Sequence, residues 1–383
     1  MTPTGIYSDG IRSRVQLAKS TKLSRPSVTE LTQELLGEGL IEEVGSERIP
    51  GKVGKHPTLL AFNPNAYHLV AVDIGGTSIS CVLADLHGKI LYQQQARFNH
   101  PSVPQAIEQL LRLIGAVVEQ ATRPLLGIAI GVPGRVDSDT GIVQDATNLG
   151  WRNVPLRKSV SERFQLPTYI GNDTNVAALG EYRFGQGRAT ENLVVIMLGT
   201  GIGAGIVLRG KVIEGESLAA GEIGHFPFRE IDELCTCGRR GCLETVSSGW
   251  GLARRAQHIA QAHPESLLNQ FAADSQIDAL TVQHAAEKGD PHAITLIETA
   301  GIYLGLAMTH IIQLLNPGHI LLAGNLVRFG DFLFDPLLRT IREHTVPEVF
   351  SRTEIAVSQL GDRIVLLGAT ALLLEQELNL WRV

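Results

Sequence analysis

The hydrophobic residues between positions 67 and 198 fall in short, nearly continuous runs that end at or near glycine. We expect a buried strand at each of four runs: YHLVAVD (67–73), SISCVLADL (78–86), LLGIAIGVPG (125–134) and LVVIML (193–198). Apolar runs of this length are typical of strands that are covered on both faces of a sheet. The sequence therefore predicts central strands rather than exposed hairpins in this part of the chain.

Two of these strands pass through a glycine turn directly into a second strand. Gly75-Gly76-Thr77 follows the first run, and GTGIGAG (199–205) follows the last. A dinucleotide-binding fingerprint leads from its glycines into a helix, so this pattern argues against NAD. The turns are either hairpins that use the conformational freedom of glycine, or phosphate cradles rich in N–H groups and in the hydroxyls of Thr77 and Thr200. Asp73 either holds a metal–phosphate complex or caps its turn.

The first 65 residues have the pattern of a DNA-binding head. We expect a short helix at 14–20, a turn at 21–23 and a second helix at 25–36 with Ser24 as its N-cap. Val28, Leu31 and Leu35 repeat at helical spacing and are predicted to face Leu17, Ala18 and Leu23. The outward positions are then Arg25, Ser27, Thr29, Glu30 and Gln33. Such a pair of helices suits insertion of the second helix into a major groove; the alternative is a helical cap.

Residues 40–44 and 58–62 are predicted to pair as a hairpin, or wing, around a glycine- and lysine-rich loop. This hairpin would bring three basic side chains near DNA phosphates, namely those of Arg48, Lys52 and Lys55. The alternative is a solvated basic loop. Only about a dozen residues precede the helix at 14–20, where a winged-helix domain normally has one more helix. We therefore expect this first helix to be truncated.

Composition sets limits on the class of protein. The 383 residues include 33 Lys and Arg against 39 Asp and Glu, a net charge of −6, which excludes a chain coated with basic charge for nucleic acid. The head holds 8 basic and 7 acidic residues, so its net charge is +1 and −7 remains for the rest. A hydrophobic share of 44% indicates a globular chain of two or three domains. Without a signal-peptide core or an apolar run of about eighteen residues, we expect the cytoplasm and no membrane partner.

Two further segments carry candidate chemistry. In YIGNDTNVAALGE (169–181), Asp173 precedes a helix predicted at 176–184, where it is either an N-cap or a general base toward a substrate hydroxyl. His225, Cys235, Cys237 and Cys242 follow the order H-x9-C-x-C-x4-C. Three thiolates and one imidazole form a closed tetrahedral set, which predicts a structural Zn²⁺ rather than three free cysteines. Glu222 and Glu244 flank the cluster, either as surface residues or held rigidly toward a polyhydroxylated ligand.

Together these motifs resemble the ROK family of repressors and sugar kinases. The matching segments are DIGGT (73–77), VPGRVD (132–137), GNDTNVAALGE (171–181), LGTGIGAGIV (198–207) and GEIGH…CTCGRRGCLE (221–244). The resemblance covers about residues 67–383, and the head resembles the winged helix of family regulators. It implies an α/β fold of the actin/hexokinase type, with two ribonuclease-H-like lobes and a sugar cleft. The implied domains are a winged helix-turn-helix at 1–65, a first lobe at 67–184, a second lobe with the zinc loop at 185–366, and a C-terminal helix at 367–383 that returns to the first lobe.

The resemblance also implies roles for individual residues. Sugar contacts would be made by Asn172, Asp173, Glu222, His225 and Glu244. Asp173 is the catalytic base in kinase members, and His225 both ligates zinc and reaches the sugar. The ATP-phosphate loops correspond to Asp73, Gly75, Gly76, Thr77, Gly199, Thr200, Gly201 and Gly203. Two departures weaken the ATP site: LAGNL (322–326) is poor in glycine for an adenosine motif, and Ser78 replaces a longer polar residue.

Two functions are compatible with this sequence. In the first, the chain is a sugar-responsive transcriptional repressor that binds operator DNA as a homodimer or homotetramer, with a sugar or sugar phosphate closing the lobes. Its DNA contacts would be Arg25, Ser27, Thr29, Lys52 and Lys55. In the second, it is a hexose kinase that uses ATP and Mg²⁺, with Asp173 as the base.

Overall fold

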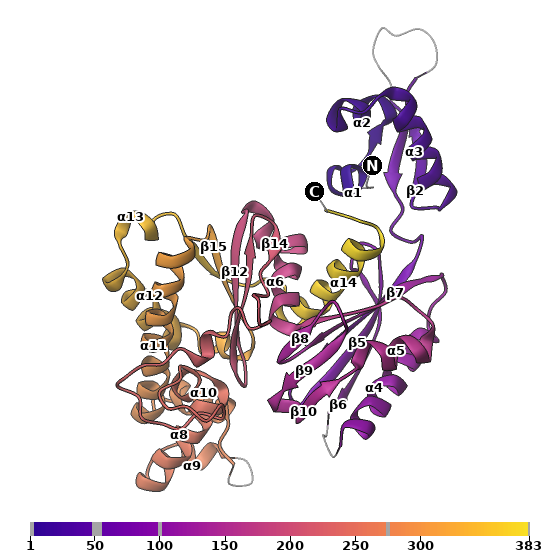
Figure 1. Cartoon of the computed structure of the whole chain (residues 1–383). Helices are drawn as coiled ribbons and strands as arrows, with labels where there is room; N and C mark the ends of the chain where they lie inside the picture. Colours follow the sequence, from indigo (N-terminus) through magenta and orange to yellow (C-terminus); the bar gives the residue numbers. More distant parts are fainter. Residues whose placement is uncertain (1–3, 48–55, 99–101, 273–275, 382–383) are drawn as a thin grey trace. The chain divides into compact units, whose positions relative to one another are not determined.

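The computed structural model describes residues 4–47, 56–98, 102–272 and 276–381 (Figure 1). The chain divides into two compact units. Unit 1 comprises residues 1–173 and 366–383, and unit 2 comprises residues 174–365. The division therefore falls within helix α6 (Asp173–Phe184) and within helix α14 (Ile364–Glu377), which both pass from one unit to the other.

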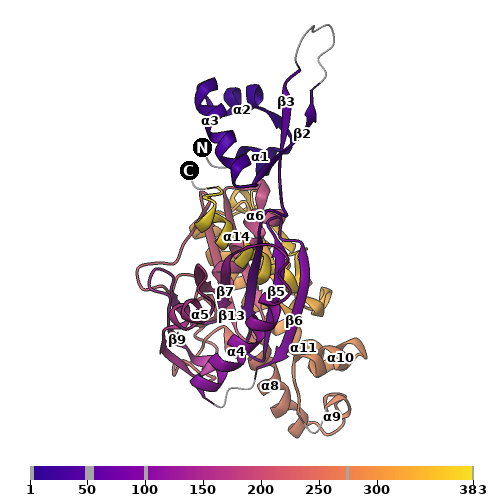
Figure 2. The same cartoon turned by 90° about the vertical axis from the view of Figure 1, so that its right-hand side faces the viewer.

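The head of unit 1 contains the predicted helix pair, α2 and α3, and the predicted hairpin, β2 and β3 (Figure 2). Its elements are α1 (Thr4–Asp9), β1 (Arg12–Ser13), α2 (Arg14–Thr21), α3 (Arg25–Gly37), β2 (Ile41–Ser46) and β3 (Thr58–Phe62). The strands form an antiparallel sheet of order β1-β3-β2. A short helix of six residues, α1, precedes the pair.

The helix pair has a small core of its own. Ser13 and Gln16 form a capping box at the start of α2, and Leu17 and Val28 are fully buried. The prediction that Leu23 belongs to this core was wrong, because its side chain is 38% exposed. Lys22 ends α2 in the left-handed conformation, so the chain turns away before Leu23. Thr32 is buried instead and accepts a 3.0 Å hydrogen bond from Arg14 Nε.

Aromatic side chains join the head to the rest of unit 1. The Tyr7 hydroxyl donates a hydrogen bond to the Leu86 carbonyl oxygen at 3.1 Å, and the Tyr7 ring lies edge-on to Trp381 with 5.2 Å between ring centroids. Phe62 stacks on His87 with 5.5 Å between the centroids. The head, the first sheet and the C-terminal segment therefore meet at one aromatic cluster, defined by Tyr7, Phe62, His87 and Trp381.

The main sheet of unit 1 has the order β11-β7-β4-β5-β6. Its strands are β4 (His68–Ile74), β5 (Ser78–Asp85), β6 (Ile90–Arg97), β7 (Leu125–Val132) and β11 (Thr168–Asn172). Strands β4, β7 and β11 are parallel, whereas β4, β5 and β6 form antiparallel hairpins. Helix α4 (Val103–Val118) packs on one face through Leu110 and Ile114, and α14 packs closely against Gly127 of β7 through Leu373. The remaining elements are β8 (Arg135–Asp137), β9 (Ile142–Ala146), η1 (Thr147–Leu149), β10 (Trp151–Val154) and α5 (Leu156–Phe164).

Unit 2 repeats this strand order as β14-β13-β12-β15-β16. Its strands are β12 (Asn192–Leu198), β13 (Ile202–Leu208), β14 (Lys211–Val212), β15 (His319–Ala323) and β16 (Glu354–Val357). Its helices after α6 are η2 (Gln186–Ala189), η3 (Ile223–His225), α7 (Glu244–Ser247), α8 (Gly249–Ala262), α9 (Leu268–Phe271), α10 (Ala279–Glu287), α11 (Pro291–Leu315), η4 (Asn325–Phe329), α12 (Asp331–His344), α13 (Pro347–Phe350) and η5 (Gly361–Arg363). The repeated sheet confirms the predicted α/β class.

Within the described residues, one helix is long and apolar enough to cross a membrane by length and composition. This helix is α11, with 25 residues and a mean hydropathy of 1.3 in its most apolar window. It lies in the core of unit 2, where Leu304, Met308 and Ile312 are fully buried. A core position in unit 2 accounts for its apolar composition.

Helix α6 packs unusually close to strand β13 because the strand presents glycine. A Cβ at Gly205 would lie 2.2 Å from the Thr174 carbonyl oxygen and 2.6 Å from Ala178 Cβ. A Cβ at Gly203 would lie 2.9 Å from the Thr174 hydroxyl oxygen. These two glycines of the GTGIGAG segment therefore allow helix–sheet contact, which is a structural role.

We expect Gly205→Ala to lower the free energy of unfolding by about 1–3 kcal/mol, because the added methyl group must displace the α6 backbone. Gly115→Ala, inside α4, is the matched control, since the atom nearest to a Cβ there would be Phe164 Cε1 at 3.9 Å. Denaturant unfolding of both variants measures the difference. Equal stabilities would contradict the packing argument.

Candidate ligand, metal and DNA sites

In unit 1, the candidate ligand residues lie at the carboxyl ends of parallel strands. Asp73 is near the end of β4, Asn172 ends β11, and Asp173 begins α6. In an open α/β sheet this edge is where ligands bind. The positions beside Asp73 in register are Gly131 on β7 and then Gly171 on β11, so no side chains crowd its carboxylate from those strands.

The predicted helix start needs correction. Asp173 is the first residue of α6, so the helix begins three positions earlier than the predicted Val176. Asn172 is held by a 2.9 Å hydrogen bond from its Nδ2 to the Gly134 carbonyl oxygen. Gly134 has a φ of +89° and packs against β9, which explains the Pro-Gly bend of the VPGR segment. The amide beside Asp173 therefore has a fixed orientation.

The glycine turn of unit 1 is a tight hairpin. The Gly75 N–H donates to the Ser78 carbonyl oxygen at 2.8 Å, and the Thr77 carbonyl oxygen accepts from the Phe98 N–H at 2.8 Å. Gly76 and Thr77 are exposed. The turn is thus closed by its own backbone, while its tip remains accessible to a ligand.

In unit 2, the glycine turn is held by two segments from elsewhere in the chain. The carbonyl oxygens of Gly199 and Thr200 accept hydrogen bonds from the first N–H groups of α8, at 2.9 and 3.1 Å. Gly324, with a φ of +94°, lies so close that a Cβ there would be 2.5 Å from the Leu198 carbonyl oxygen. The predicted phosphate turn and the predicted adenosine motif are therefore neighbours at one sheet edge.

Glu244 connects this turn to the Cys-rich loop, the segment from His225 to Cys242 that holds the candidate metal ligands. Its Oε1 accepts a 2.7 Å hydrogen bond from the Ile202 N–H, and its side chain fills the space beside Gly201 and Gly224. A Cβ at Gly201 would be 2.5 Å from Oε1. Sequence reasoning did not pair these residues, since 42 positions separate Ile202 from Glu244. The glycines at 201 and 224 were the only signal of this contact.

The predicted metal ligands converge in unit 2. The ligand atoms of His225, Cys235, Cys237 and Cys242 all lie within 4.8 Å of one another. Cys235 Sγ is 3.7 Å from His225 Nδ1, and Cys237 Sγ is 3.6 Å from Cys242 Sγ. Gly238 and Gly241 have φ values of +84° and +80°, as the tight loop requires. This donor set and spacing fit one metal ion, so the cluster could hold one.

The two nitrogens of His225 face different partners. Nδ1 points to the Cys235 sulfur, whereas Nε2 lies 3.8 Å from the Glu222 carboxylate. A carboxylate beside the second imidazole nitrogen is a common way to fix the orientation of a metal-binding histidine. The position of Glu222 is therefore linked to the orientation of the His225 ring, which belongs to the candidate metal site.

The thiols already differ in acidity without a metal. Burial favours the neutral thiol of Cys237, but hydrogen bonds from Arg239, Cys235 and Cys242 lower its pKa to about 6. Burial, together with its hydrogen bonds to the other two cysteines, raises the pKa of Cys242 to about 12. The loop thus stabilises one thiolate, which is the form that binds metal.

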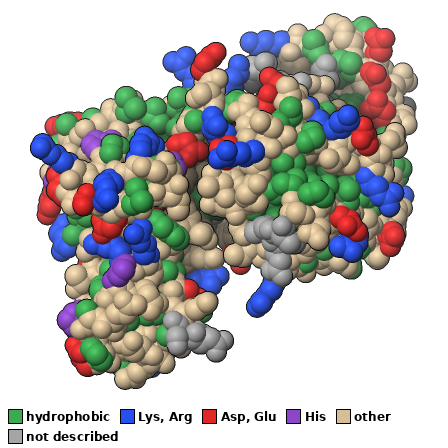
Figure 3. Space-filling view, turned by 60° about the horizontal axis from the view of Figure 1, so that its bottom comes forward, with side chains coloured by type: hydrophobic (Ala, Val, Ile, Leu, Met, Phe, Trp, Pro, Cys, Tyr) green, Lys and Arg blue, Asp and Glu red, His purple; other side chains and the backbone are tan. Residues whose placement is uncertain are grey.

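The candidate DNA-binding residues lie in the first turns of α3. Arg25 and Thr29 are exposed, and Ser27 is half-buried with its hydroxyl oxygen 2.8 Å from that of Ser24. Lys52 and Lys55, like Arg48, lie outside the described residues. On the face drawn in Figure 3, basic and acidic side chains are interspersed and form no single-sign surface there. This mixture agrees with the net charge of −6.

The repeated sheet, with ligand candidates at the carboxyl edge of each copy, defines an actin-like α/β protein that carries a helix-turn-helix head. A family model described as ROK family matches residues 69–376. The xylose repressor of Caldicellulosiruptor bescii is 30% identical over 381 residues, which cover 98% of this chain and 94% of the relative. The chain belongs to the ROK family.

Two solved structures are similar to this chain. A ROK family transcriptional regulator, described as a homolog of the E. coli MLC protein, has a TM-score of 0.84 and 29% identity. The match covers 96% of this chain and 92% of the regulator's chain. A ROK family glucokinase from Streptomyces griseus, in complex with glucose and AMPPNP, has a TM-score of 0.71 and 31% identity. This second match covers 80% of the present chain and 98% of the glucokinase.

We expect Cys235→Ser to weaken metal binding by about tenfold or more, because the closed donor set loses one thiolate. Cys81→Ala, which removes a buried thiol from unit 1, is the control and should leave the metal content unchanged. Metal analysis of both purified variants measures this. Retention of the full metal content by Cys235→Ser would contradict a site at this cluster.

Proposed function

We propose that this chain is a sugar-responsive, DNA-binding transcriptional repressor of carbohydrate metabolism, active in the cytoplasm as a homodimer or homotetramer. The observation that carries the proposal is the head. The match to the xylose repressor extends over 98% of the chain, so it includes the helix pair and hairpin. The glucokinase match uses nearly all of that enzyme and leaves about a fifth of the present chain, the size of the head, unmatched.

In this proposal, α3 enters the major groove of operator DNA. Arg25, Ser27 and Thr29 occupy its N-terminal turns, where side chains reach base edges in helix-turn-helix complexes. Lys52 and Lys55 in the hairpin loop would add contacts to phosphate, which carry no sequence information but make binding sensitive to salt.

The effector is a sugar or sugar phosphate bound by Asn172, Asp173, Glu222, His225 and Glu244. Amides, carboxylates and imidazole suit the paired donor and acceptor character of sugar hydroxyls. The ion in the Cys-rich loop is proposed to be Zn²⁺ in a structural role, since three thiolates and an imidazole match its preference and leave no open position for catalysis.

The segment at the end of the C-terminal helix contacts the head. Helix α14 begins at Ile364 in unit 2 and continues into unit 1, and the chain then reaches Trp381 in the aromatic cluster with Tyr7. We propose that coupling between the sugar and operator DNA uses this contact of the C-terminal segment with the first helix of the head. Coupling of this kind needs two sites and a shared element whose state both ligands bias.

We expect Arg25→Ala to weaken operator binding by about 1–3 kcal/mol, roughly 5- to 150-fold, because a base contact at the start of α3 is lost. Lys288→Ala, an exposed change at the end of α10 in unit 2, is the charge-matched control. Gel shifts on operator DNA at fixed salt measure both. Equal losses in the two variants would contradict recognition by α3.

We expect Asp173→Asn to abolish the response of DNA binding to sugar while leaving DNA binding without sugar intact. Asp139→Asn, an exposed change in the same unit, should retain the response. Operator affinity is measured with and without each member of a panel of hexoses, pentoses and their phosphates. A full response in the Asp173 variant would remove this residue from the sugar site.

A second candidate function is ATP-dependent hexose phosphorylation, favoured by the likeness to a glucokinase that binds glucose and AMPPNP. Asp173 would accept the proton of the attacking sugar hydroxyl, and the two glycine turns, with Mg²⁺ at Asp73, would hold the ATP phosphates. The residues proposed for this role are Gly75, Gly76, Thr77, Gly199, Thr200, Gly201 and Gly203. Sugar-dependent ADP release that disappears in Asp173→Asn, together with absent operator binding, would establish the kinase in place of the repressor.

A further inference from the structure

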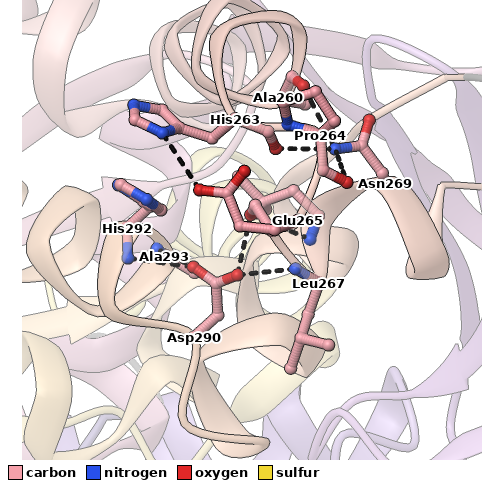
Figure 4. A network of polar contacts seen from close by, with 11 residues as sticks. Ala260, His263, Pro264, Glu265, Leu267, Asn269, Asp290, His292 and Ala293 are labelled. Atoms are coloured by element: carbon pink, nitrogen blue, oxygen red, sulfur yellow. Dashed lines mark hydrogen bonds and ion pairs between the residues drawn. The ribbon is translucent and has the colours of Figure 1, made fainter.

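A second group of metal-binding side chains lies in unit 2, apart from the Cys-rich loop. His263 and Glu265 lie between α8 and α9, and His292 is in the first turn of α11. One ligand atom from each residue lies within 4.8 Å of the others. The three side chains face one another in Figure 4. None of the three is among the candidate residues for DNA, sugar or ATP binding.

The spacing of two of these donors already matches a metal shell. His263 Nδ1 is 3.2 Å from Glu265 Oε1. Two donors bound tetrahedrally at the usual zinc distances would be about 3.3 Å apart. The rings of His263 and His292 are stacked with 4.0 Å between their centroids. His263 and His292 are half-buried, whereas the Glu265 side chain is exposed and has room to move toward a shared ion.

A buried carboxylate fixes the backbone that carries the three donors. Asp290 is 3% exposed. Its Oδ1 accepts from the N–H groups of His292 and Ala293, both at 2.9 Å, and its Oδ2 accepts from the Ser266 hydroxyl and the Leu267 N–H, both at 2.7 Å. These hydrogen bonds join the segment after α8 to the start of α11 (Figure 4). Although burial opposes ionisation, they lower the pKa of Asp290.

Both donor segments are also stiffened by proline. His263-Pro264-Glu265 and Asp290-Pro291-His292 each hold a proline between two polar residues. Proline fixes its own φ and restricts the residue before it, so less entropy is lost when the donors are ordered around an ion. Asn269 Nδ2 further ties the first segment to the carbonyl oxygens of Ala260 and His263, both at 3.1 Å.

We propose that His263, Glu265 and His292 form a second metal site that binds a divalent transition-metal ion such as Zn²⁺. Two imidazoles and one carboxylate favour Zn²⁺, Ni²⁺ or Cu²⁺ over Mg²⁺ and Ca²⁺, which prefer oxygen ligands. The three protein ligands leave a coordination position for water or a small ligand. The ion would cross-link the end of α8 to the start of α11.

A cavity of about 350 Å³ adjoins one of the three proposed ligands, His292. It is lined by both helices and includes His292, His258 and Thr295. Glu233 of the Cys-rich loop lines the same cavity and forms a 3.4 Å ion pair with Arg255 of α8. The second site is therefore next to the loop of the first, while sharing none of its ligands.

The test counts Zn²⁺ ions bound by the full chain. Isothermal titration with Zn²⁺ should reveal one more saturable equivalent in the wild type than in His292→Ala. This variant keeps the Asp290 cap, because the cap uses the backbone N–H of residue 292. His310→Ala removes another exposed imidazole from the same helix and should retain the additional equivalent. Mg²⁺ should not compete.

Further variants separate this site from the Cys-rich loop. Cys235→Ser should lose the loop equivalent and keep the second one, and Glu265→Gln should weaken the second one by about tenfold or more. Thermal unfolding followed by circular dichroism checks that each variant is folded. Equal Zn²⁺ counts in the wild type and His292→Ala, or equal losses in His292→Ala and His310→Ala, would overturn the proposal.

Discussion

The hydrogen bond from the Ile202 N–H to the Glu244 carboxylate is the contact on which the candidate site of unit 2 depends. It holds the Cys-rich loop against the glycine turn at 2.7 Å, and Gly201 and Gly224 are the residues that give Glu244 its space. Glu222 and His225 flank Gly224 in the same segment. A metal ion in the loop would therefore stiffen the cysteine and histidine ligands and, through Glu244, the turn that ends the central strand.

The same arrangement is built twice from different residues. Each unit has a five-stranded sheet in which three parallel strands continue into two antiparallel strands, and each has a glycine turn at the carboxyl end of its central strand. Glycine serves this design in more than one way. Gly75 and Gly199 belong to turns, whereas Gly203 and Gly205 allow α6 to approach β13. A glycine-rich motif is thus partly a packing requirement and only partly a ligand site.

The features that depend on residues close together in the chain were predictable from the sequence. The buried strands, the helix pair of the head and the spacing of the cysteines each depend on neighbours along the chain, and all are present in the structure. Long-range contacts were not predictable in this way. Glu181, the last residue of the GNDTNVAALGE motif, is fully buried and accepts hydrogen bonds from Ser358 and from the Gln186 N–H. Leu23 was misplaced because a single left-handed residue redirects the chain. His263 and His292 were not paired because the hydrogen bonds of the buried Asp290 that join their two segments are long-range.

The central claim is a thermodynamic coupling between sugar and operator DNA, and it is tested most directly by reciprocity. The Kd for operator DNA is measured with and without the sugar, and the Kd for the sugar is measured with and without operator DNA. For one protein with two linked sites, the two ratios must be equal and different from one. Our account predicts a shared factor of about 5 to 150. Ratios of one for every sugar that binds would contradict it.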